Sequence, residues 1–218
     1  MKKKNSVWAG KVLVLASAKG GAGKTTLAAA VAGELLRRGQ RVILLDADPQ
    51  ESGGLSQWHS ASSSSELGTA QLYREAREVA AAQARGQALE GAVVIVDTAG
   101  SLTRTTLALI TEADLVVVPA RAGGLDAARA VEMVQLVQQA SAAPCVVVLN
   151  AVTRSSMPAH IRAELREAGV LVLRTEVGQR VAFPTAQLHG TTPAFLPGSG
   201  VAASEIKSLV DELQKVLK

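Results

Sequence analysis

The feature that most constrains this chain is a glycine-rich segment that joins an apolar run to a helical pattern. The run KVLVLA is followed at residues 17–26 by SAKGGAGKTT, and helical periodicity begins directly afterwards. Glycines in such a turn let several backbone N–H groups face one anion, and the following helix adds its positive end. Lys24 is placed to reach β- and γ-phosphates and the Thr25 hydroxyl to bind Mg²⁺. A glycine-rich turn with incidental lysines would not require this order, so the segment predicts a nucleotide-binding loop.

Short apolar runs alternate with helical stretches along the 218 residues, which predicts one α/β domain spanning residues 1–218. Four of the runs are almost entirely Val, Leu and Ile, as is typical of strands covered on both faces. The expected fold is a single doubly wound, mostly parallel β-sheet with helices on both faces. Residues 1–9 are expected to form a flexible basic tail, and residues 51–66 a mobile surface loop. The expected strands are 12–16, 42–45, 93–96, 115–118, 146–149 and 170–173, and the expected helices are 24–38, 73–85, 102–111, 125–140 and 158–168.

Composition narrows the compartment and the classes of partner. The single cysteine, Cys145, permits no disulfide framework or cysteine metal site within one chain, which favours a reducing cytosol. No apolar stretch approaches the length of a membrane span, and the basic N-terminus has no apolar signal-peptide region, so a soluble, cytoplasmic protein is expected. The net charge of +4 is compatible with a polyanionic partner, whereas the 2% aromatic content leaves little material for base stacking.

Two further apolar runs end in carboxylates. In parallel sheets the ligand crevice lies at the carboxyl ends of the strands, so these residues are candidates for the same site as the glycine-rich loop. Asp46 and Asp48 occur in LLDADPQES, where one carboxylate is suited to the magnesium shell and the other to orienting an attacking water. Turn or helix-capping aspartates are the alternative. In VVIVDTAGS, Asp97 is expected to hold Mg²⁺ through water, and Gly100 to bring a backbone N–H to the γ-phosphate as a switch.

Together these segments resemble the ParA/MinD family of ATPases, whose phosphate loop has the deviant Walker A form Lys-Gly-Gly-x-Gly-Lys-[Ser/Thr]. The second motif, DADPQ at 46–50, resembles the Asp-x-Asp-Pro-Gln motif that is typical of the DNA-partitioning branch of the family. In its short length the chain resembles the small ParF-like plasmid partition ATPases. The loop matches at Lys19, Gly20, Gly21, Gly23, Lys24 and Thr25, and the likeness extends over nearly the whole chain through DTAGSL at 97–102, DLVVVPA at 114–120, LD at 125–126 and GQRVAFPTA at 178–186.

The resemblance implies a homodimer in which two subunits sandwich two ATP molecules with Mg²⁺. Lys24 would serve the subunit's own ATP, and Lys19 the ATP of the partner, much as an arginine finger does. A solvated lysine beside an anion site is the alternative for Lys19. By the same resemblance, Asp48 would position the attacking water. The implied nucleotide-binding residues are Lys19, Gly20, Gly21, Ala22, Gly23, Lys24, Thr25, Thr26 (α-phosphate) and Asn150 (adenine edge). The implied catalytic residues are Lys19, Lys24 and Asp48. The implied metal-site residues are Thr25, Asp46 and Asp97, and the implied switch residues are Asp97 and Gly100.

The resemblance also implies partners. ATP-driven dimers of the family bind DNA non-specifically, and a small ParB- or ParG-like adaptor protein stimulates weak intrinsic hydrolysis. The expected function is therefore segregation of plasmid or chromosomal DNA by a nucleoid-associated ATPase. Non-specific binding needs Lys and Arg side chains against phosphates. Residues 2–4 are lysines that would contribute, and the other candidates are Arg154, Arg162, Arg166, Arg174, Arg180 and Lys207.

Several alternatives remain beside DNA partition. A ParA-like ATPase can instead position a protein cargo or an organelle. A MinD-like ATPase attaches to membranes through its last helix, but SEIKSLVDELQKVLK has no aromatic residues and acidic residues offset its lysines, so core packing is expected rather than stable membrane association. Iron–sulfur carriers with this loop need paired cysteines at the dimer interface, and the single cysteine of this chain is too few unless two subunits pair. A dethiobiotin-synthetase-like ligase would need substrate-recognition residues that the sequence does not display.

Overall fold

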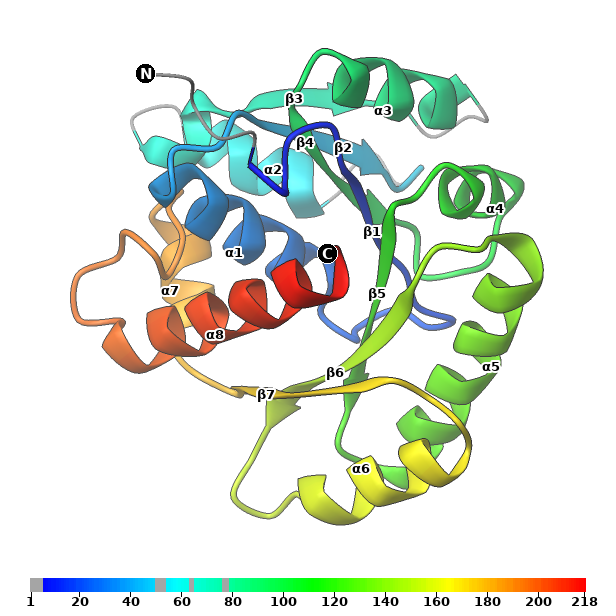
Figure 1. Ribbon diagram of the computed structural model, residues 1–218. Helices are drawn as coiled ribbons and strands as arrows, with labels where there is room; N and C mark the ends of the chain where they lie inside the picture. The colour runs from blue at the N-terminus through cyan, green and yellow to red at the C-terminus, as the bar shows by residue number, and fades with distance from the viewer. Residues whose placement is uncertain (1–5, 50–53, 63–64, 76–78) are drawn as a thin grey trace.

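The computed structural model describes residues 6–49, 54–62, 65–75 and 79–218 and shows one seven-stranded sheet (Figure 1). All strand pairs are parallel, in the order β3-β2-β4-β1-β5-β6-β7. The α/β prediction is confirmed. The strands are β1 (Val12–Leu15), β2 (Val42–Ala47), β3 (Gln71–Arg74), β4 (Val93–Thr98), β5 (Leu115–Arg121), β6 (Cys145–Val152) and β7 (Val172–Gly178). The helices are α1 (Lys24–Arg37), α2 (Gly54–Ala61), the 3₁₀ helix η1 (Glu66–Thr69), α3 (Val79–Leu89), α4 (Arg104–Thr111), α5 (Gly124–Ala140), α6 (Pro158–Glu167), α7 (Ala182–Leu188) and α8 (Gly200–Val216).

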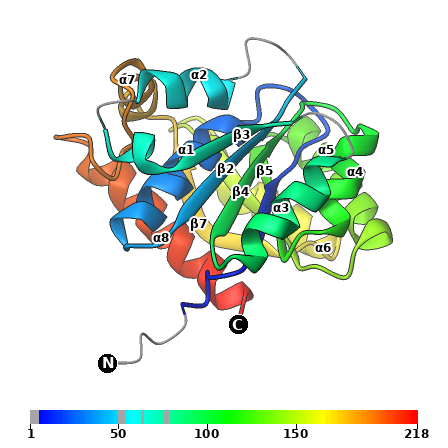
Figure 2. The same ribbon diagram turned by 90° about the horizontal axis from the view of Figure 1, so that it is seen from above.

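Helices cover both faces of the sheet because alternate residues of each strand point to opposite sides. In β1, Leu13 and Leu15 belong to one buried cluster, whereas Val12 and Val14 belong to the other. The first cluster takes its α-helical residues from α1, α2, α7 and α8, and the second from α3, α4, α5 and α6. Figure 2 shows these two groups of helices on either side of the sheet. The central strands are therefore fully buried, and their polar chemistry is confined to their ends.

Two expectations about the segment between β2 and β4 are wrong. A helix was expected over residues 73–85, but Tyr73 lies in β3 and α3 begins at Val79. The expected mobile loop at 51–66 contains α2, whose Leu55 and Trp58 are 0% and 2% exposed. Residues 50–53, 63–64 and 76–78 lie outside the described residues. Strand β3 was not predicted because it is a four-residue edge strand whose side chains are exposed or half-buried, so its sequence shows no apolar run.

The N-terminal segment departs from its prediction, whereas the last helix agrees with it. Trp8 is 2% exposed and belongs to the first core cluster, so the expected flexible tail over 1–9 does not hold at this residue, and lysines 2–4 lie outside the described residues. At the other end, Ile206, Leu209 and Leu213 of α8 are buried against the core. Core packing of the last helix is therefore observed. Within the described residues, no helix is both long enough and apolar enough to cross a membrane.

Candidate nucleotide-binding site

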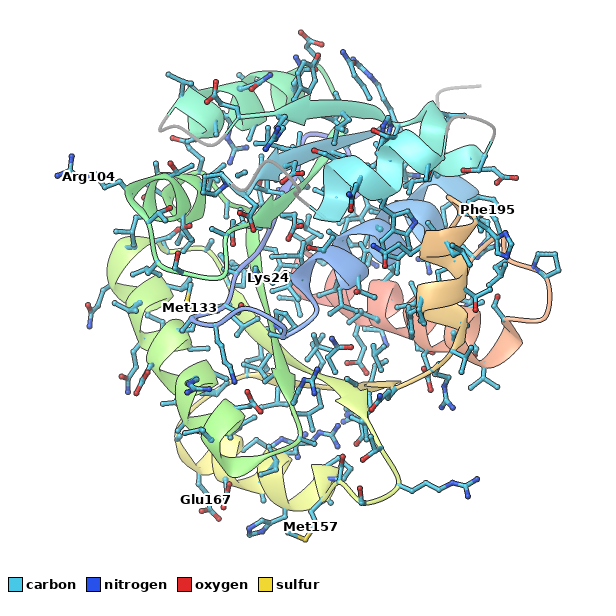
Figure 3. The ribbon with its side chains drawn as sticks, turned by 180° about the vertical axis from the view of Figure 1, so that it is seen from behind. Lys24, Arg104, Met133, Met157, Glu167 and Phe195 are labelled. Atoms are coloured by element: carbon cyan, nitrogen blue, oxygen red, sulfur yellow. The ribbon has the colours of Figure 1, made fainter. Side chains whose placement is uncertain are left out.

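The glycine-rich loop connects the buried end of β1 to the first turn of α1 and holds one of its two lysines inward. Lys24 is 7% exposed, and its Nζ donates a hydrogen bond to Ser17 Oγ at 3.0 Å. Ser17 Oγ in turn donates to the backbone carbonyl of Lys19 at 2.7 Å. Burial lowers the pKa of Lys24, and the nearby carboxylates Asp97 and Asp48 oppose that shift. In Figure 3, Lys24 lies at the centre of the molecule, at the ends of the strands. Its ammonium group is thus oriented before any ligand arrives.

The other lysine of the loop has a different environment. Lys19 is exposed, at the outer rim of the loop, beside the first turns of α5. A small depression there is lined by Lys19 together with Asp126 and Arg129 of α5. The two lysines are therefore not equivalent, because Lys24 faces into the subunit and Lys19 lies open to solvent.

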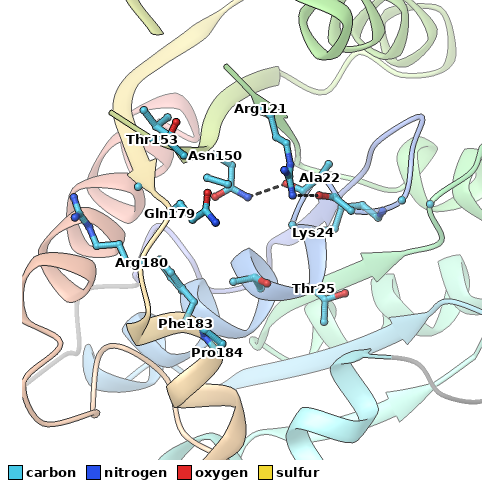
Figure 4. A pocket seen from close by; sticks show the side chains of 18 of the residues that line it. Ala22, Lys24, Thr25, Arg121, Asn150, Thr153, Gln179, Arg180, Phe183 and Pro184 are labelled. Carbon is cyan, nitrogen blue, oxygen red and sulfur yellow. Dashed lines mark hydrogen bonds between the residues drawn. The ribbon is translucent and has the colours of Figure 1, made fainter. Parts of the chain in front are cut away.

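Glycine at position 23 is required by both backbone and packing. Its φ is +94°, and a Cβ built there would lie 2.1 Å from Asn150 Nδ2. Asn150 is 6% exposed, and its Nδ2 donates to the carbonyl of Ala22 at 2.8 Å. Arg121 Nη2, at the end of β5, donates to the carbonyl of Gly21 at 3.4 Å (Figure 4). The ends of β5 and β6 thus hold the loop in shape, which is a role for Asn150 that sequence reasoning did not assign.

Thr25 and Asp97 meet on the opposite side of the loop. Thr25 Oγ1 donates to Asp97 Oδ2 at 2.6 Å, while Asp97 is 2% exposed. Burial raises the pKa of Asp97 to about 7; the Thr25 bond and Lys24 oppose this, and Asp46 and Asp48 add to it. Within the described part of the chain, Asp97 Oδ1 is buried without a hydrogen-bond partner.

This pair of residues fits a magnesium ion of the kind that nucleotides bring. Mg²⁺ is usually held by one or two carboxylates together with substrate phosphates and waters. The described residues contain no group of three or more His, Cys, Asp and Glu that would form a complete cage. The Thr25 hydroxyl and the Asp97 carboxylate, one of whose oxygens has no partner among the described residues, lie beside the phosphate loop. They would hold Mg²⁺ together with the phosphates of a bound nucleotide.

The two aspartates at the end of β2 differ in their exposure. Asp46 is 0% exposed and lies opposite Asp97 in the β2–β4 register. Its Oδ1 accepts from the backbone N–H of Asp48 at 3.2 Å, and its Oδ2 accepts from the backbone N–H of Ser56 at 2.9 Å. Asp48 is half-buried and lines the cleft. The geometry therefore makes Asp48 the accessible carboxylate and Asp46 the buried one beneath it.

Gly100 lies against the loop at the end of β4. A Cβ at this position would lie 2.8 Å from both Cα and N of Gly20, so only glycine permits the approach. The close contact places the segment after Asp97 directly beside the phosphate loop. That position suits the switch role predicted for Gly100, which stays a prediction.

A cleft of about 1480 Å³ joins these groups at the carboxyl ends of the strands. One half of it is the phosphate loop with Thr26, Asp48 and Gly100. The other half is shown in Figure 4; from the sequence, Asn150 was expected there as a nucleotide-binding residue, whereas Arg180 was expected to contact DNA and the remaining residues had no assigned role. The signal was available, because these residues follow β6 and β7 at the same edge of the sheet. They include Thr153, Gln179, Arg180, Phe183 and Pro184.

The six basic residues expected to contact DNA fall into two groups. Three are held in ion pairs: Arg162 with Glu176 at 2.9 Å, Arg180 with Glu205, and Lys207 with Asp211 at 3.0 Å. The other three, which are exposed and take part in none of the ion pairs found among the described residues, are Arg154, Arg166 and Arg174. The second group is better suited to an anionic partner, since its charges are not already neutralised.

Replacement of Asp97 by Asn is expected to stabilise the protein without nucleotide, and more so at high pH. Because the folded-state pKa is raised, folding binds a proton between about pH 4 and pH 7, and stability falls as pH rises through that window. At pH 5 the buried carboxyl is already neutral, so the substitution changes little. At pH 8 we expect Tm to rise by about 3 °C or more, roughly the effect of 1 kcal/mol in a domain of this size.

Thermal unfolding at the two pH values measures this difference. Glu66→Gln removes an exposed carboxylate and serves as the control, with no pH-dependent gain expected. An Asp97→Asn protein whose Tm difference from wild type is the same at pH 5 and pH 8 would contradict the raised pKa.

Comparison with known proteins connects this site to a family. The family model described as the CobQ/CobB/MinD/ParA nucleotide binding domain matches residues 13–194. The chain is similar to Protein ParA of Rhizobium radiobacter, with 34% identity over 90% of this chain and 91% of that protein. It is also similar to Maintenance of carboxysome distribution protein A of Halothiobacillus neapolitanus, with 30% identity over 92% and 95%. Among solved structures, the septum site-determining protein MinD of Pyrococcus horikoshii, complexed with Mg-ADP, superposes with a TM-score of 0.74 at 16% identity, over 94% of this chain and 96% of that chain.

Proposed function

The chain belongs to the CobQ/CobB/MinD/ParA family of nucleotide-binding domains, and from that premise we propose that it is an ATPase that switches between monomer and dimer. ATP with Mg²⁺ would favour a sandwich homodimer, the dimer would bind nucleoid DNA non-specifically, and slow hydrolysis under control of an adaptor would reset it. The observation that carries this proposal is the unequal placement of Lys24 and Lys19.

The chain's own residues divide the work of hydrolysis in this account. Lys24 and the backbone N–H groups of the loop bind and neutralise the phosphates, while Thr25 and Asp97 would hold Mg²⁺, which supplies charge neutralisation at the phosphoryl group. Asp48 would orient the attacking water from the edge of the cleft. Lys19 of the partner subunit would add a second cation, so that catalysis depends on dimer formation.

Segregation of plasmid or chromosomal DNA is the first candidate for the biological task. The similarity to a ParA protein and the net charge of +4 support it. Positioning of a protein cargo is the second, favoured by the similarity to a carboxysome distribution protein. In this proposal both tasks would use the same ATP-controlled attachment to DNA, and only the cargo would differ.

DNA binding is expected to require ATP and to weaken steeply with salt. A dimer that neutralises about four phosphates should lose roughly 100-fold in affinity between 50 mM and 200 mM salt, because bound counterions are released. Electrophoretic or fluorescence-anisotropy titration of a random-sequence duplex, with ATP, ADP or no nucleotide, measures this.

The arginine groups provide the controls for that experiment. Replacing both Arg166 and Arg174 by Ala should weaken binding and reduce the salt slope, whereas Lys207→Ala, which removes one side of an ion pair on α8, should change the slope less. Affinity that is independent of ATP, or independent of salt, would contradict nucleoid attachment.

A further inference from the structure

Helix α2 lies over the magnesium side of the site, although its segment had been expected to be a loop. Its first residue, Gly54, lies so close to Thr25 that a Cβ there would be 2.9 Å from Thr25 Cγ2. Two residues later, Ser56 contacts Asp46. The first turn of α2 therefore packs against two residues of the predicted metal site.

Ser56 makes two hydrogen bonds to one carboxylate oxygen. Its backbone N–H donates to Asp46 Oδ2 at 2.9 Å, and its hydroxyl donates to the same oxygen at 2.5 Å. A carboxylate at the first turn of a helix is stabilised by the positive end of the helix dipole, so Asp46 and the first described turn of α2 stabilise each other. Asp46 is 0% exposed, whereas Ser56 is half-buried.

The second oxygen of Asp46 extends the chain of contacts to Asp48. Asp46 Oδ1 accepts from the backbone N–H of Asp48 at 3.2 Å, at the point where β2 has ended. The conformation of the Asp48 backbone therefore depends on how Asp46 is oriented. Because Ser56 fixes the other oxygen of Asp46, the orientation of Asp48 depends on α2.

The far end of α2 is anchored outside the phosphate site. Trp58 is 2% exposed and its Nε1 donates to the carbonyl of Thr191 at 2.7 Å, in the segment that follows α7. A Cβ at Gly190 would lie 1.8 Å from the carbonyl oxygen of Ala61, so the end of α2 fits tightly against the same segment. Figure 2 shows α2 and α7 side by side, and their residues are in contact. The helix is thus fixed at both ends.

We propose that Ser56 is a positioning residue that orients Asp48 for hydrolysis by fixing the carboxylate of Asp46. The inference rests on the proposed ATPase function, in which Asp48 orients the attacking water. The Ser56 hydroxyl contacts Asp46, and Asp46 in turn contacts the backbone of Asp48, so Ser56 would act on Asp48 through Asp46. Loss of its hydroxyl should therefore affect turnover and leave nucleotide binding, which depends on Lys24 and the loop, unchanged.

Ser56→Ala tests this by separating kcat from binding. We expect kcat for ATP to fall about 10-fold, the lower end of the effect of removing a group that orients a site residue. KM and the Kd of a fluorescent ATP analogue with Mg²⁺ should stay within about twofold of wild type. The ATP dimer should persist longer by the same factor as kcat falls, which is a readout independent of steady-state activity.

Two variants distinguish orientation from a loss of helix stability. Ser56→Thr retains the hydroxyl and should keep kcat within about threefold of wild type. Ser60→Ala removes a hydroxyl on the same helix that donates to the Ser56 carbonyl and does not contact Asp46, so it should behave as wild type. Should Ser56→Ala not fold, Ser56→Cys is nearly isosteric with a weak donor and should show a smaller loss of kcat.

The outcomes separate this inference from the proposed function. A wild-type kcat in Ser56→Ala or Ser56→Cys, an equal loss in Ser60→Ala, or a rise in Kd that matches the loss of kcat would overturn the role of Ser56. In each case the wild-type protein would still turn over ATP. If the wild-type chain neither hydrolyses ATP nor dimerises with it, the proposed function fails and the inference fails with it.

Discussion

Asp48→Ala is expected to lower kcat for ATP by about 100-fold or more while leaving ATP binding intact. Asp48 is half-buried in the cleft and close enough to Lys24 to influence its pKa, so its carboxylate is within the reacting region. The other two aspartates near the loop are buried, and each already accepts a hydrogen bond: Asp46 from Ser56 and Asp97 from Thr25. No other described carboxylate of the cleft is positioned to replace it beside the phosphate loop.

The same substitution should accumulate the dimer. If hydrolysis resets the switch, blocking it traps the ATP-bound state, which size-exclusion chromatography with ATP and Mg²⁺ would detect as a lasting species of twice the monomer mass. Glu66→Ala removes an exposed carboxylate of η1 and should behave as wild type. Normal turnover in Asp48→Ala would refute its catalytic role.

Lys19→Gln is expected to abolish ATP-dependent dimerisation with little change in ATP affinity. The ammonium group of Lys19 is exposed at the rim of the loop, whereas the phosphates would be gripped by the buried Lys24 and the loop backbone. The loss should therefore appear only where two subunits meet. A trans-acting cation of this kind is worth about 10³-fold or more in turnover in phosphoryl-transfer enzymes.

Three variants make that result specific. Lys24→Gln should lose ATP binding itself, because it removes the cation inside the cradle. Lys215→Gln removes an exposed lysine of α8 and should leave both properties unchanged. If Lys19→Gln forms ATP-dependent dimers as readily as wild type, Lys19 does not act on the nucleotide of the partner and is a solvated surface lysine.

Most of the fold could be predicted because the central strands are continuous apolar runs. β1, β4 and β6 are buried along nearly their whole length, and burial on both faces leaves a signal that needs no knowledge of neighbours. β3 and α2 were missed for the opposite reason. β3 is a short edge strand, and α2 is a two-turn helix whose Leu55 and Trp58 are its only buried residues, so its pattern emerges only when Thr191 and α1 are in place.

The residues of the phosphate half could be proposed from the sequence because most of them are contiguous in it. The structure places Lys24 beside Ser17 and Thr25 beside Asp97, and the nucleotide and metal roles expected for them stay predictions. The roles of Asn150 and Ser56 arise from contacts that the motifs do not contain. Asn150 meets Ala22 across 128 positions, and Ser56 meets Asp46 from an element that had no helical signal. Such partners follow from strand order and helix placement, which a motif does not encode.

The central claim is that one complete site needs residues from two subunits, and mixing two inactive variants tests it most directly. Lys19→Gln should bind ATP and lack the lysine for its partner, whereas Lys24→Gln should lack ATP and still offer Lys19. If Lys19 acts on the partner's nucleotide, the mixture should hydrolyse ATP and form heterodimers well above the sum of the separate variants. A mixture no more active than that sum would contradict the account, because it would place both lysines in the service of the same subunit's nucleotide.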